Sequence, residues 1–365
     1  MKNILVTGGC GFLGHHLVEH LLKNTDANIK VIDRLSYASA GLDRLRDIQA
    51  FDDKRVLVLG ADLTDRLPSG VIRELGIVDA IIHAAAESHV DRSIEDPVPF
   101  IQSNVMGTHH ILMLARQLEV PRTLLVSTDE VYGAARSDAT HEDFCPTQLI
   151  DALDSAMGQD GIYADSVGFC TCGSAGFAPN SPYRPGNPYA ATKAAAECLA
   201  FAYANTYKIP VHIVNTMNLI GERQGVEKFV PLVIRAVMRG HTVKIHADAA
   251  REKSGTRFYL HCRTFASALL HLLQPHVAPP AKSHVVGERE ISNLELAQTI
   301  AGIVGKPLKY ELVDFHSSRP GHDLRYAMQD TVAHDTGWVR PTTLDTSLEK
   351  TVRWYLDPKN ARWLE

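Results

Sequence analysis

The chain has 365 residues, of which 45% are hydrophobic and 22% are charged, and its formal net charge is −5. This composition is typical of a globular protein with one large or two medium domains. A weakly negative chain without a long basic run is not expected to bind nucleic acid. The chain has no run of 18 uncharged apolar residues, and its N-terminal "MKNILVTGG" lacks a signal-peptide cleavage site, so neither a membrane span nor secretion is expected.

The six cysteines are sparse and irregularly spaced, which predicts free thiols in a reducing compartment and therefore a cytoplasmic location. Cys170 and Cys172 lie close together, but further ligands at zinc-like spacings are missing. Histidine pairs at 15–16 and 109–110 fall within predicted helices, where adjacent side chains point apart. We therefore predict no metal site.

Strand and helix patterns alternate along the first part of the chain. Strands are predicted at 2–8, 28–34, 54–62, 78–86 and 122–130, with helices that include 14–24 and 107–118. Short apolar strands separated by helices pair in parallel through right-handed crossovers. The expected fold class is α/β, with a doubly wound parallel sheet of the Rossmann type.

The pattern weakens at 134–186, a stretch rich in Gly, Ser, Asp and Pro that predicts a long loop insertion. A helix at 188–207 and a strand at 210–218 follow, and the alternation then becomes irregular, with helices at 227–240 and 293–305. We predict a larger domain at 1–213 and a smaller α/β domain at 214–365, partly interleaved with the first.

The stretch "TGGCGFLG" at 7–14 lies between the first strand and the first helix, and its glycines Gly8, Gly11 and Gly14 have a GxxGxxG spacing. Such glycines let the backbone turn tightly and approach a pyrophosphate at the helix N-terminus. Asp33 ends the second strand, where a carboxylate can bind an adenosine ribose and repel a 2′-phosphate. This favours NAD over NADP, although Arg34 is adjacent; an ordinary glycine turn with a surface aspartate is the alternative.

Asp62 ends the third strand, where it could contact adenine or cap a helix. Tyr189 and Lys193 are spaced i,i+4 and would share one face of a helix. A lysine ammonium near a phenol favours the phenolate and lowers its pKa, so Tyr189 could remove a hydroxyl proton during hydride transfer. A core tyrosine beside a surface lysine is the alternative.

Residues 127–133 are "STDEVYG", in which Asp129 and Glu130 follow an apolar run typical of a buried strand. Buried strands rarely contain acids. Adjacent side chains of a strand face opposite sides, so both acids can reach one substrate only if the strand ends at Thr128. A solvated turn after the strand is the alternative.

These motifs together resemble the short-chain dehydrogenase/reductases of the extended type, and within them the dTDP-glucose 4,6-dehydratase family. The similar stretches are "DRLSYA" at 33–38, "HAAAESHVDRSI" at 83–94, "STDEVYG", "NPYAATKAAAE" at 187–197, "VEKFVP" at 226–231, "SRPGHDLRYA" at 318–327 and "TVRWYLD" at 351–357. The adjacent acids distinguish this group from related 4-epimerases and sugar-acid decarboxylases.

The resemblance implies a division of roles. Tyr189, with Lys193, would serve as base in oxidation at C4 of the sugar, with Thr128 bonded to the C4 hydroxyl. Glu130 would remove the C5 proton and Asp129 would protonate the departing C6 hydroxyl, before the hydride returns to C6. Neighbouring carboxylates can divide these roles because they push their pKa values apart.

The resemblance also implies binding residues and a homodimer. The NAD contacts would be Gly8, Gly11, Phe12, Leu13, Gly14, Asp33, Leu35, Ser36, Asp62, Leu63, Ala84, Ala85, Ala86, Ser103, Tyr189 and Lys193. The nucleotide-sugar contacts would be Ser88, Thr128, Asn215, Lys228, Phe229, Arg257, Asn293, Arg319 and His322. The dimer would pair the helix at about 100–118 with the Tyr189 helix in a four-helix bundle.

Three stretches depart from the group's pattern, at 134–186, 241–257 and "NTMNLIGERQG". Because family members bind the nucleotide or cover the site there, the base and the sugar stay open. Three functions remain in view: an NDP-glucose 4,6-dehydratase, a 4-epimerase or decarboxylase on the same scaffold, and a non-catalytic NAD-binding scaffold.

Overall fold

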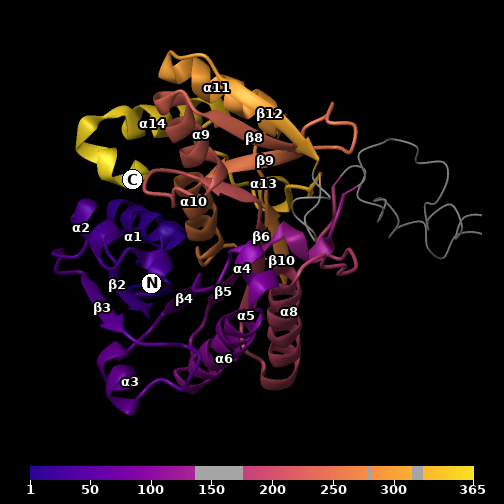
Figure 1. Cartoon of the computed structure of the whole chain (residues 1–365). Helices are drawn as coiled ribbons and strands as arrows, with labels where there is room; N and C mark the ends of the chain where they lie inside the picture. Colours follow the sequence, from indigo (N-terminus) through magenta and orange to yellow (C-terminus); the bar gives the residue numbers. More distant parts are fainter. Residues whose placement is uncertain (136–175, 278–280, 315–323) are drawn as a thin grey trace, which may run out of the picture.

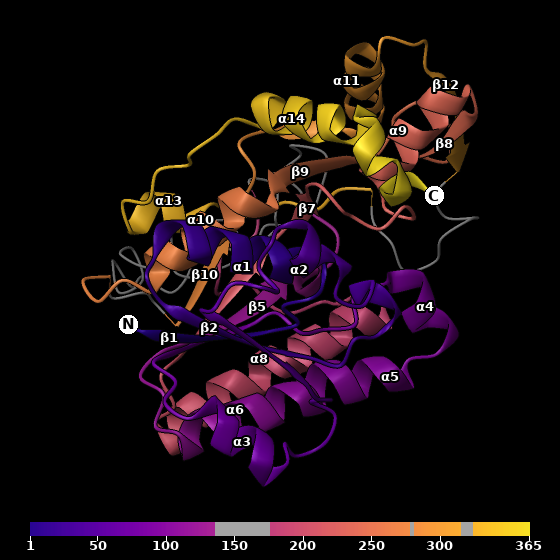
Figure 2. The ribbon, with the colours of Figure 1, turned by 90° about the vertical axis from the view of Figure 1, so that its left-hand side faces the viewer.

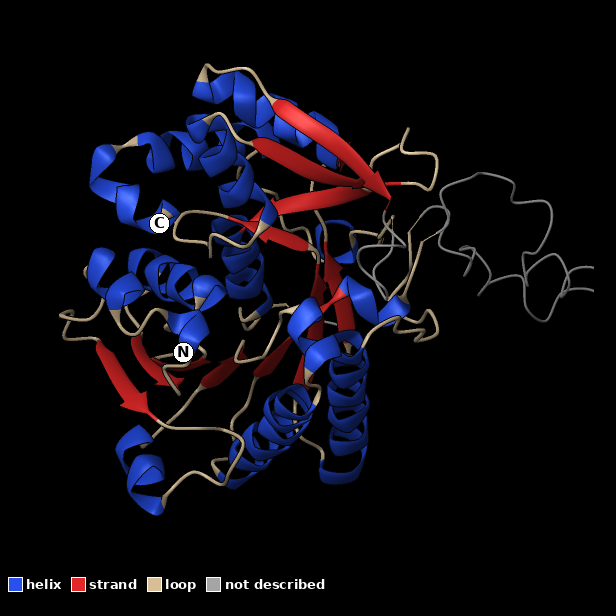
Figure 3. Ribbon diagram, in the orientation of Figure 1, coloured by secondary structure: helices blue, strands red, loops and turns tan. Residues whose placement is uncertain are grey.

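The computed structural model describes residues 1–135, 176–277, 281–314 and 324–365. Its centre is a seven-stranded sheet in the order β3-β2-β1-β4-β5-β6-β10, and all of its strand pairs are parallel (Figure 1, Figure 3). The strands are β1 (Asn3–Thr7), β2 (Asn28–Asp33), β3 (Val56–Gly60), β4 (Ala80–His83), β5 (Thr123–Thr128), β6 (Val211–Thr216) and β10 (Lys282–Val285). The predicted doubly wound α/β fold is confirmed.

Helices cover both faces of this sheet because its strands are apolar on both sides. Ile4 and Val6 of β1 pack in one core cluster, and Leu5 between them packs in another. One face carries α1 (Phe12–Asn24), α2 (Asp43–Asp47) and α10 (Cys262–Leu272), and the other carries α3 (Ser69–Leu75), α6 (Gly107–Gln117) and α8 (Pro188–Tyr207) (Figure 2).

The chain leaves the large sheet after β6 and returns to it at β10. Between and after these strands it forms the smaller part, whose strands pair as β11-β9-β7 and β12-β8. This part contains β7 (Asn218–Ile220), α9 (Phe229–Arg239), β8 (Thr242–Ala247), β9 (Thr256–His261), β11 (Glu290–Ser292), α11 (Asn293–Val304), β12 (Lys309–Asp314) and α14 (Leu344–Leu356). The boundary predicted after residue 213 falls inside β6.

Short elements complete the described chain: η1 (Tyr37–Ser39), α4 (Val90–Glu95), α5 (Val98–Phe100), the π-helix η2 (Ile101–Met106), η3 (Asp129–Tyr132), α13 (Thr331–Asp335) and η4 (Pro358–Leu364). The helix expected at about 100–118 is therefore a π-helical turn followed by α6. None of the described helices combines the length and apolar character needed to cross a bilayer. In the same residues, no group of three or more His, Cys, Asp or Glu side chains could hold a metal ion.

Several predictions concern residues outside the described ranges. Most of the loop insertion, with Cys145, Cys170 and Cys172, lies at 136–175, and Arg319 and His322 lie at 315–323.

Candidate active site

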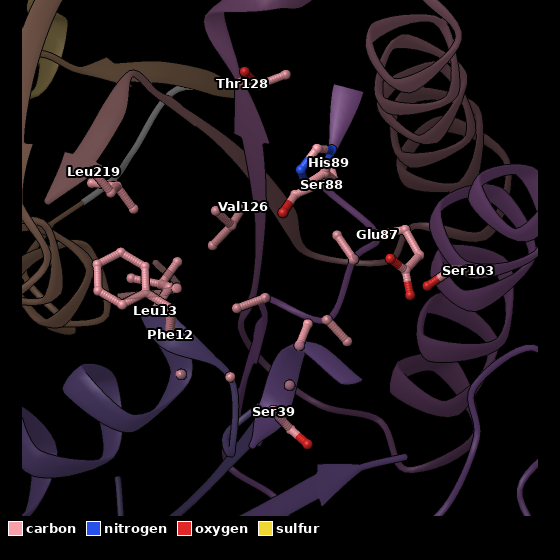
Figure 4. Close-up of a pocket in the computed structure, with 18 of the residues that line it drawn as sticks. Phe12, Leu13, Ser39, Glu87, Ser88, His89, Ser103, Val126, Thr128 and Leu219 are labelled. Carbon is pink, nitrogen blue, oxygen red and sulfur yellow. The ribbon is translucent and has the colours of Figure 1, made fainter. Parts of the chain in front are cut away.

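A cavity of about 590 Å³ opens at the carboxyl ends of the parallel strands, where doubly wound folds bind their ligands. Figure 4 shows side chains from distant segments around it: Leu13 at the start of α1, Thr128 at the end of β5, Ser88 after β4 and Leu219 in β7. The cavity thus lies between the large sheet and the smaller part of the chain.

The glycine turn has the close packing that a dinucleotide cradle requires. Gly8 has a φ of +69°, and a Cβ added there would lie 2.8 Å from the Ala85 Cα atom. A Cβ on Gly14 would lie 1.9 Å from the Gly8 carbonyl oxygen. Side chains are therefore excluded at both positions, and the backbone at the start of α1 stays open to a pyrophosphate.

The end of β2 fits the ribose of NAD. The Asp33 carboxylate accepts the backbone N–H groups of Cys10 (2.9 Å) and Leu35 (2.8 Å), which fixes its position beside the glycine turn. Each carboxylate oxygen can still accept a further hydrogen bond.

Arg34, which could have bound a 2′-phosphate, is paired with acids. Its guanidinium bonds Glu87 and lies 3.7 Å from Asp62. The Tyr37 hydroxyl also donates to Glu87 (3.0 Å), and Arg92 lies 3.8 Å over the Tyr37 ring. This network satisfies the charge of Arg34, and sequence reasoning missed it because Glu87 is 53 residues away.

Tyr189 and Lys193 lie on α8, and both are buried and line the cavity. The Lys193 ammonium donates to the Val126 carbonyl oxygen (2.7 Å), and burial lowers the pKa of Lys193 to about 8. We expected Lys193 to lower the pKa of Tyr189. Instead, burial and then the Glu130 charge raise it. A hydrogen bond with Thr128 acts in the opposite direction.

The two acids reach one cavity because β5 ends at Thr128 and the chain turns into η3 there. The Thr128 hydroxyl accepts the Glu130 N–H (3.3 Å) and donates to Asp129 Oδ1 (2.9 Å). Asp129 Oδ2 is buried without a hydrogen-bond partner among the described residues. The expectation that the strand must end at Thr128 is confirmed.

Burial raises the pKa values of both carboxyl groups. The Asp129 value rises to about 6. The Glu130 value rises to about 7 through burial and the neighbouring Asp129 charge, and a hydrogen bond from Asn187 opposes the rise. The pair can therefore hold a proton near neutral pH, as acid–base chemistry requires.

Asn187 is a site residue that sequence reasoning missed. Its Oδ1 caps α8 by accepting the Ala190 N–H (2.8 Å), and its Nδ2 donates to Glu130 Oε2 (2.9 Å). An Asn before Pro at a helix start signals the cap. The contact with Glu130 joins segments 57 residues apart, and local sequence gives no sign of it.

The predicted cofactor residues except Leu35 line the cavity, together with Ser88, Thr128, Lys228 and Phe229 from the substrate set. Leu35 is not among the lining residues, and it supplies a backbone N–H to Asp33. The charge of Lys228 lowers the pKa of Glu130.

Three predicted substrate residues do not line the cavity in the described structure. Asn215 is fully buried, and its Nδ2 donates to the Thr128 carbonyl and to Glu197. Asn293 accepts the Tyr259 hydroxyl at the start of α11. Arg257 donates to the Leu324 carbonyl, yet its charge lowers the pKa values of Asp129 and Glu130.

Known proteins resemble the chain along its full length. The GDP-mannose 4,6 dehydratase family model matches residues 5–148, and the NAD dependent epimerase/dehydratase family model matches 146–287. The dTDP-glucose 4,6-dehydratase of Neisseria gonorrhoeae is 34% identical, over 99% of this chain and 97% of that protein. The chain belongs to the dTDP-glucose 4,6-dehydratase family.

Other relatives agree with this membership. An Escherichia coli dTDP-glucose 4,6-dehydratase is 32% identical over 99% of this chain and 94% of its own length. The crystal structure of DesIV, a dTDP-glucose 4,6-dehydratase from Streptomyces venezuelae with NAD and TYD bound, superposes with a TM-score of 0.79 at 30% identity and covers 100% of both chains. A Thermus thermophilus UDP-glucose 4-epimerase, at 23% identity and a TM-score of 0.77, shares the fold.

The predicted family, NAD dependence and enzyme class are therefore confirmed. This protein is an NAD-dependent dehydratase, which belongs to the hydro-lyases. The glycine cradle, Asp33 and the cavity fit the cofactor.

Proposed function

We propose that the enzyme converts dTDP-glucose into the 4-keto-6-deoxy sugar. The observation that carries this proposal is the adjacent pair Asp129 and Glu130, which turns into the same cavity as Tyr189 at the end of β5. The relatives named dTDP-glucose 4,6-dehydratase support the choice of nucleotide sugar. A 4-epimerase needs no acid–base pair for elimination, so the buried Asp129 and the half-buried Glu130 in one cavity favour dehydration.

Each side chain of the site has its own role in the proposed reaction. Tyr189 takes the proton of the C4 hydroxyl, which Thr128 orients, and Lys193 supplies positive charge on the same helix face. Bound NAD would accept the hydride from C4 and later return it to C6. The 4-ketone acidifies C5, so that Glu130 can take the C5 proton while Asp129 gives a proton to the leaving C6 hydroxyl as water departs. When the hydride returns to C6, Glu130 would give a proton back to C5.

Hydrogen bonding supports the roles of the two acids. The Asn187 amide donates to Glu130 and favours its charged form, which a base needs. Asp129 Oδ2 is buried without a described partner, which favours a proton over a charge on that oxygen. The pKa values alone, about 6 for Asp129 and about 7 for Glu130, have the opposite order, so the assigned roles require the bound substrate to reverse it.

The test is incubation with dTDP-, UDP-, CDP- and GDP-glucose, with products identified by mass and NMR. Loss of deuterium from C5 and a 4-keto-6-deoxy product from dTDP-glucose are expected. A C4-inverted sugar with C6 intact would show an epimerase, and NAD binding without turnover of any sugar would show a scaffold. Tyr189→Phe should prevent the oxidation, whereas Glu130→Gln should permit oxidation and stall elimination.

We also propose that the enzyme is a homodimer in the cytoplasm. Val98, Ile101, Met106, Phe201 and Tyr207 are exposed apolar side chains on the neighbouring helices α5, η2 and α8, which suits an isologous interface (Figure 1). The free thiols of Cys10, Cys198 and Cys262 suit a reducing compartment. Sedimentation should show a dimer that Ile101→Asp dissociates, while Val339→Asp, at an exposed site on another part of the chain, should leave it intact.

A further inference from the structure

Helix α8 carries a third polar residue in line with its catalytic pair. Glu197 follows Lys193 by four residues, as Lys193 follows Tyr189, so the three side chains share one face of the helix. Glu197 is fully buried. A buried carboxylate is costly unless it is paired and hydrogen-bonded, so its partners should reveal its role.

Four side chains from other segments converge on the Glu197 carboxylate. Oε1 accepts hydrogen bonds from the Ser127 hydroxyl and from Asn215 Nδ2 (2.7 Å). Oε2 accepts the Tyr183 hydroxyl (2.6 Å) and pairs with Lys282 Nζ (2.6 Å). Both oxygens are therefore satisfied, as a charged carboxylate requires at this depth.

The same unit holds the end of β5 at three consecutive residues. Lys193 donates to the Val126 carbonyl (2.7 Å), Ser127 donates to Glu197, and Asn215 bridges Glu197 to the Thr128 carbonyl (2.8 Å). These contacts stop at the residue after which the chain turns to present Asp129 and Glu130.

The charge of Glu197 also acts on Lys193. Burial lowers the Lys193 pKa to about 8, and Glu197 is the neighbouring charge that opposes this effect. Since Tyr189 is itself buried among acids that disfavour its phenolate, the reaction needs the lysine in its ammonium form.

We propose that Glu197 is a positioning residue of the oxidation step: it keeps Lys193 charged and, through Ser127 and Asn215, fixes the end of β5. This inference rests on the proposed function for its catalytic meaning, but the charge state of Lys193 can be measured without turnover. Glu197 does not line the cavity, so it would not contact a ligand bound there.

The test distinguishes a positioning role of Glu197 toward Lys193 from a role only as the counter-ion of Lys282. Glu197→Gln keeps the shape of the side chain but leaves Lys282 without its buried counter-charge, which costs stability. The double variant Glu197→Gln/Lys282→Met removes both charges, and the methionine can pack on the Tyr132 and Tyr183 rings that Lys282 now covers at 4.4 and 4.5 Å. Lys282→Met alone is the matched control.

The primary readout is the pH dependence of Lys193 reductive methylation by formaldehyde and cyanoborohydride, read by peptide mass. Because only the free amine reacts, the half-point reports the lysine charge state. In the double variant it should fall below the wild-type value, and the alkaline limit of the C4 oxidation rate should move to lower pH with it. A melting temperature near that of wild type would confirm that the double variant is folded.

An unchanged half-point for Lys193 methylation in a folded double variant would overturn the proposal. A double variant whose C4 oxidation rate depends on pH as in wild type would overturn it as well. Absence of dTDP-glucose turnover by the wild-type enzyme would instead refute the proposed function, and the labelling result would still decide the role of Glu197.

Discussion

The replacement Asn187→Ser separates two tasks of one side chain. Asn187 caps α8 with its oxygen and holds Glu130 with its nitrogen. A serine hydroxyl caps helices about as well as an asparagine but is too short to reach Glu130. We therefore expect the fold to persist and the base to lose its donor.

The size of the effect follows from the kind of bond that is removed. A hydrogen bond to a charged group contributes about 1.5–3 kcal/mol, and each ~1.4 kcal/mol changes a rate about tenfold. If the donor positions Glu130 for removal of the C5 proton, elimination should slow roughly 10- to 100-fold. Asn187 also lowers the Glu130 pKa against the burial that raises it to about 7. Its loss should move the acidic limb of the elimination rate to higher pH, because the base must be deprotonated.

The assay is single-turnover reaction with dTDP-glucose, in which NADH absorbance follows oxidation and mass follows loss of water. Asn187→Ser should accumulate NADH, since oxidation is spared and elimination is slow. Asn187→Ala should show the same kinetics with an additional loss of about 1 kcal/mol in stability from the missing cap. A serine variant with the wild-type elimination rate and acidic limb would refute the assigned role of this contact.

Three further outcomes are expected. Gly14→Ala should abolish NAD binding in calorimetry because its Cβ would meet the Gly8 carbonyl, whereas Gly70→Ala, with open space around it, should bind NAD normally. C4 oxidation should decline as pH rises through about 8, where Lys193 loses its proton, and a flat profile there would contradict that role. The folded-state pKa of Glu130 is raised from 4.5 to about 7, so its contribution to stability falls as pH rises across that interval. In denaturant titrations, the free energy of unfolding of Glu130→Gln minus that of wild type should therefore be more favourable at pH 7 than at pH 4.5. An equal difference at both pH values would contradict the raised Glu130 pKa.

Local patterns in the sequence predict much of this fold and site. The alternation of apolar strands with helices predicts the parallel sheet, and the glycine spacing with Asp33 predicts the cofactor cradle. The two acids after an apolar run predict that β5 ends at Thr128. Each of these signals spans a few neighbouring residues, where turn geometry and side-chain periodicity act directly.

The remaining features depend on contacts between distant segments. Glu130 meets Asn187 across 57 residues, and Ser127 meets Glu197 across 70. Asn215, predicted as a substrate contact, likewise lies near the end of β6, and its amide donates to Glu197, 18 residues away. The lowered tyrosine pKa was expected from helix spacing alone, but burial has the larger effect on Tyr189.

The return of the chain to the large sheet at β10 has a consequence for biosynthesis. Lys282 is the first residue of that strand, so the counter-ion of Glu197 is translated 85 residues after the acid itself. A nascent chain that ends before β10 can form the earlier parallel pairs, yet it leaves β6 as an open edge and Glu197 without the Lys282 ammonium. Assembly of the catalytic helix is thereby coupled to completion of the smaller part of the chain, and a truncated product would be open to aggregation and proteolysis instead of persisting as a partly active dehydratase.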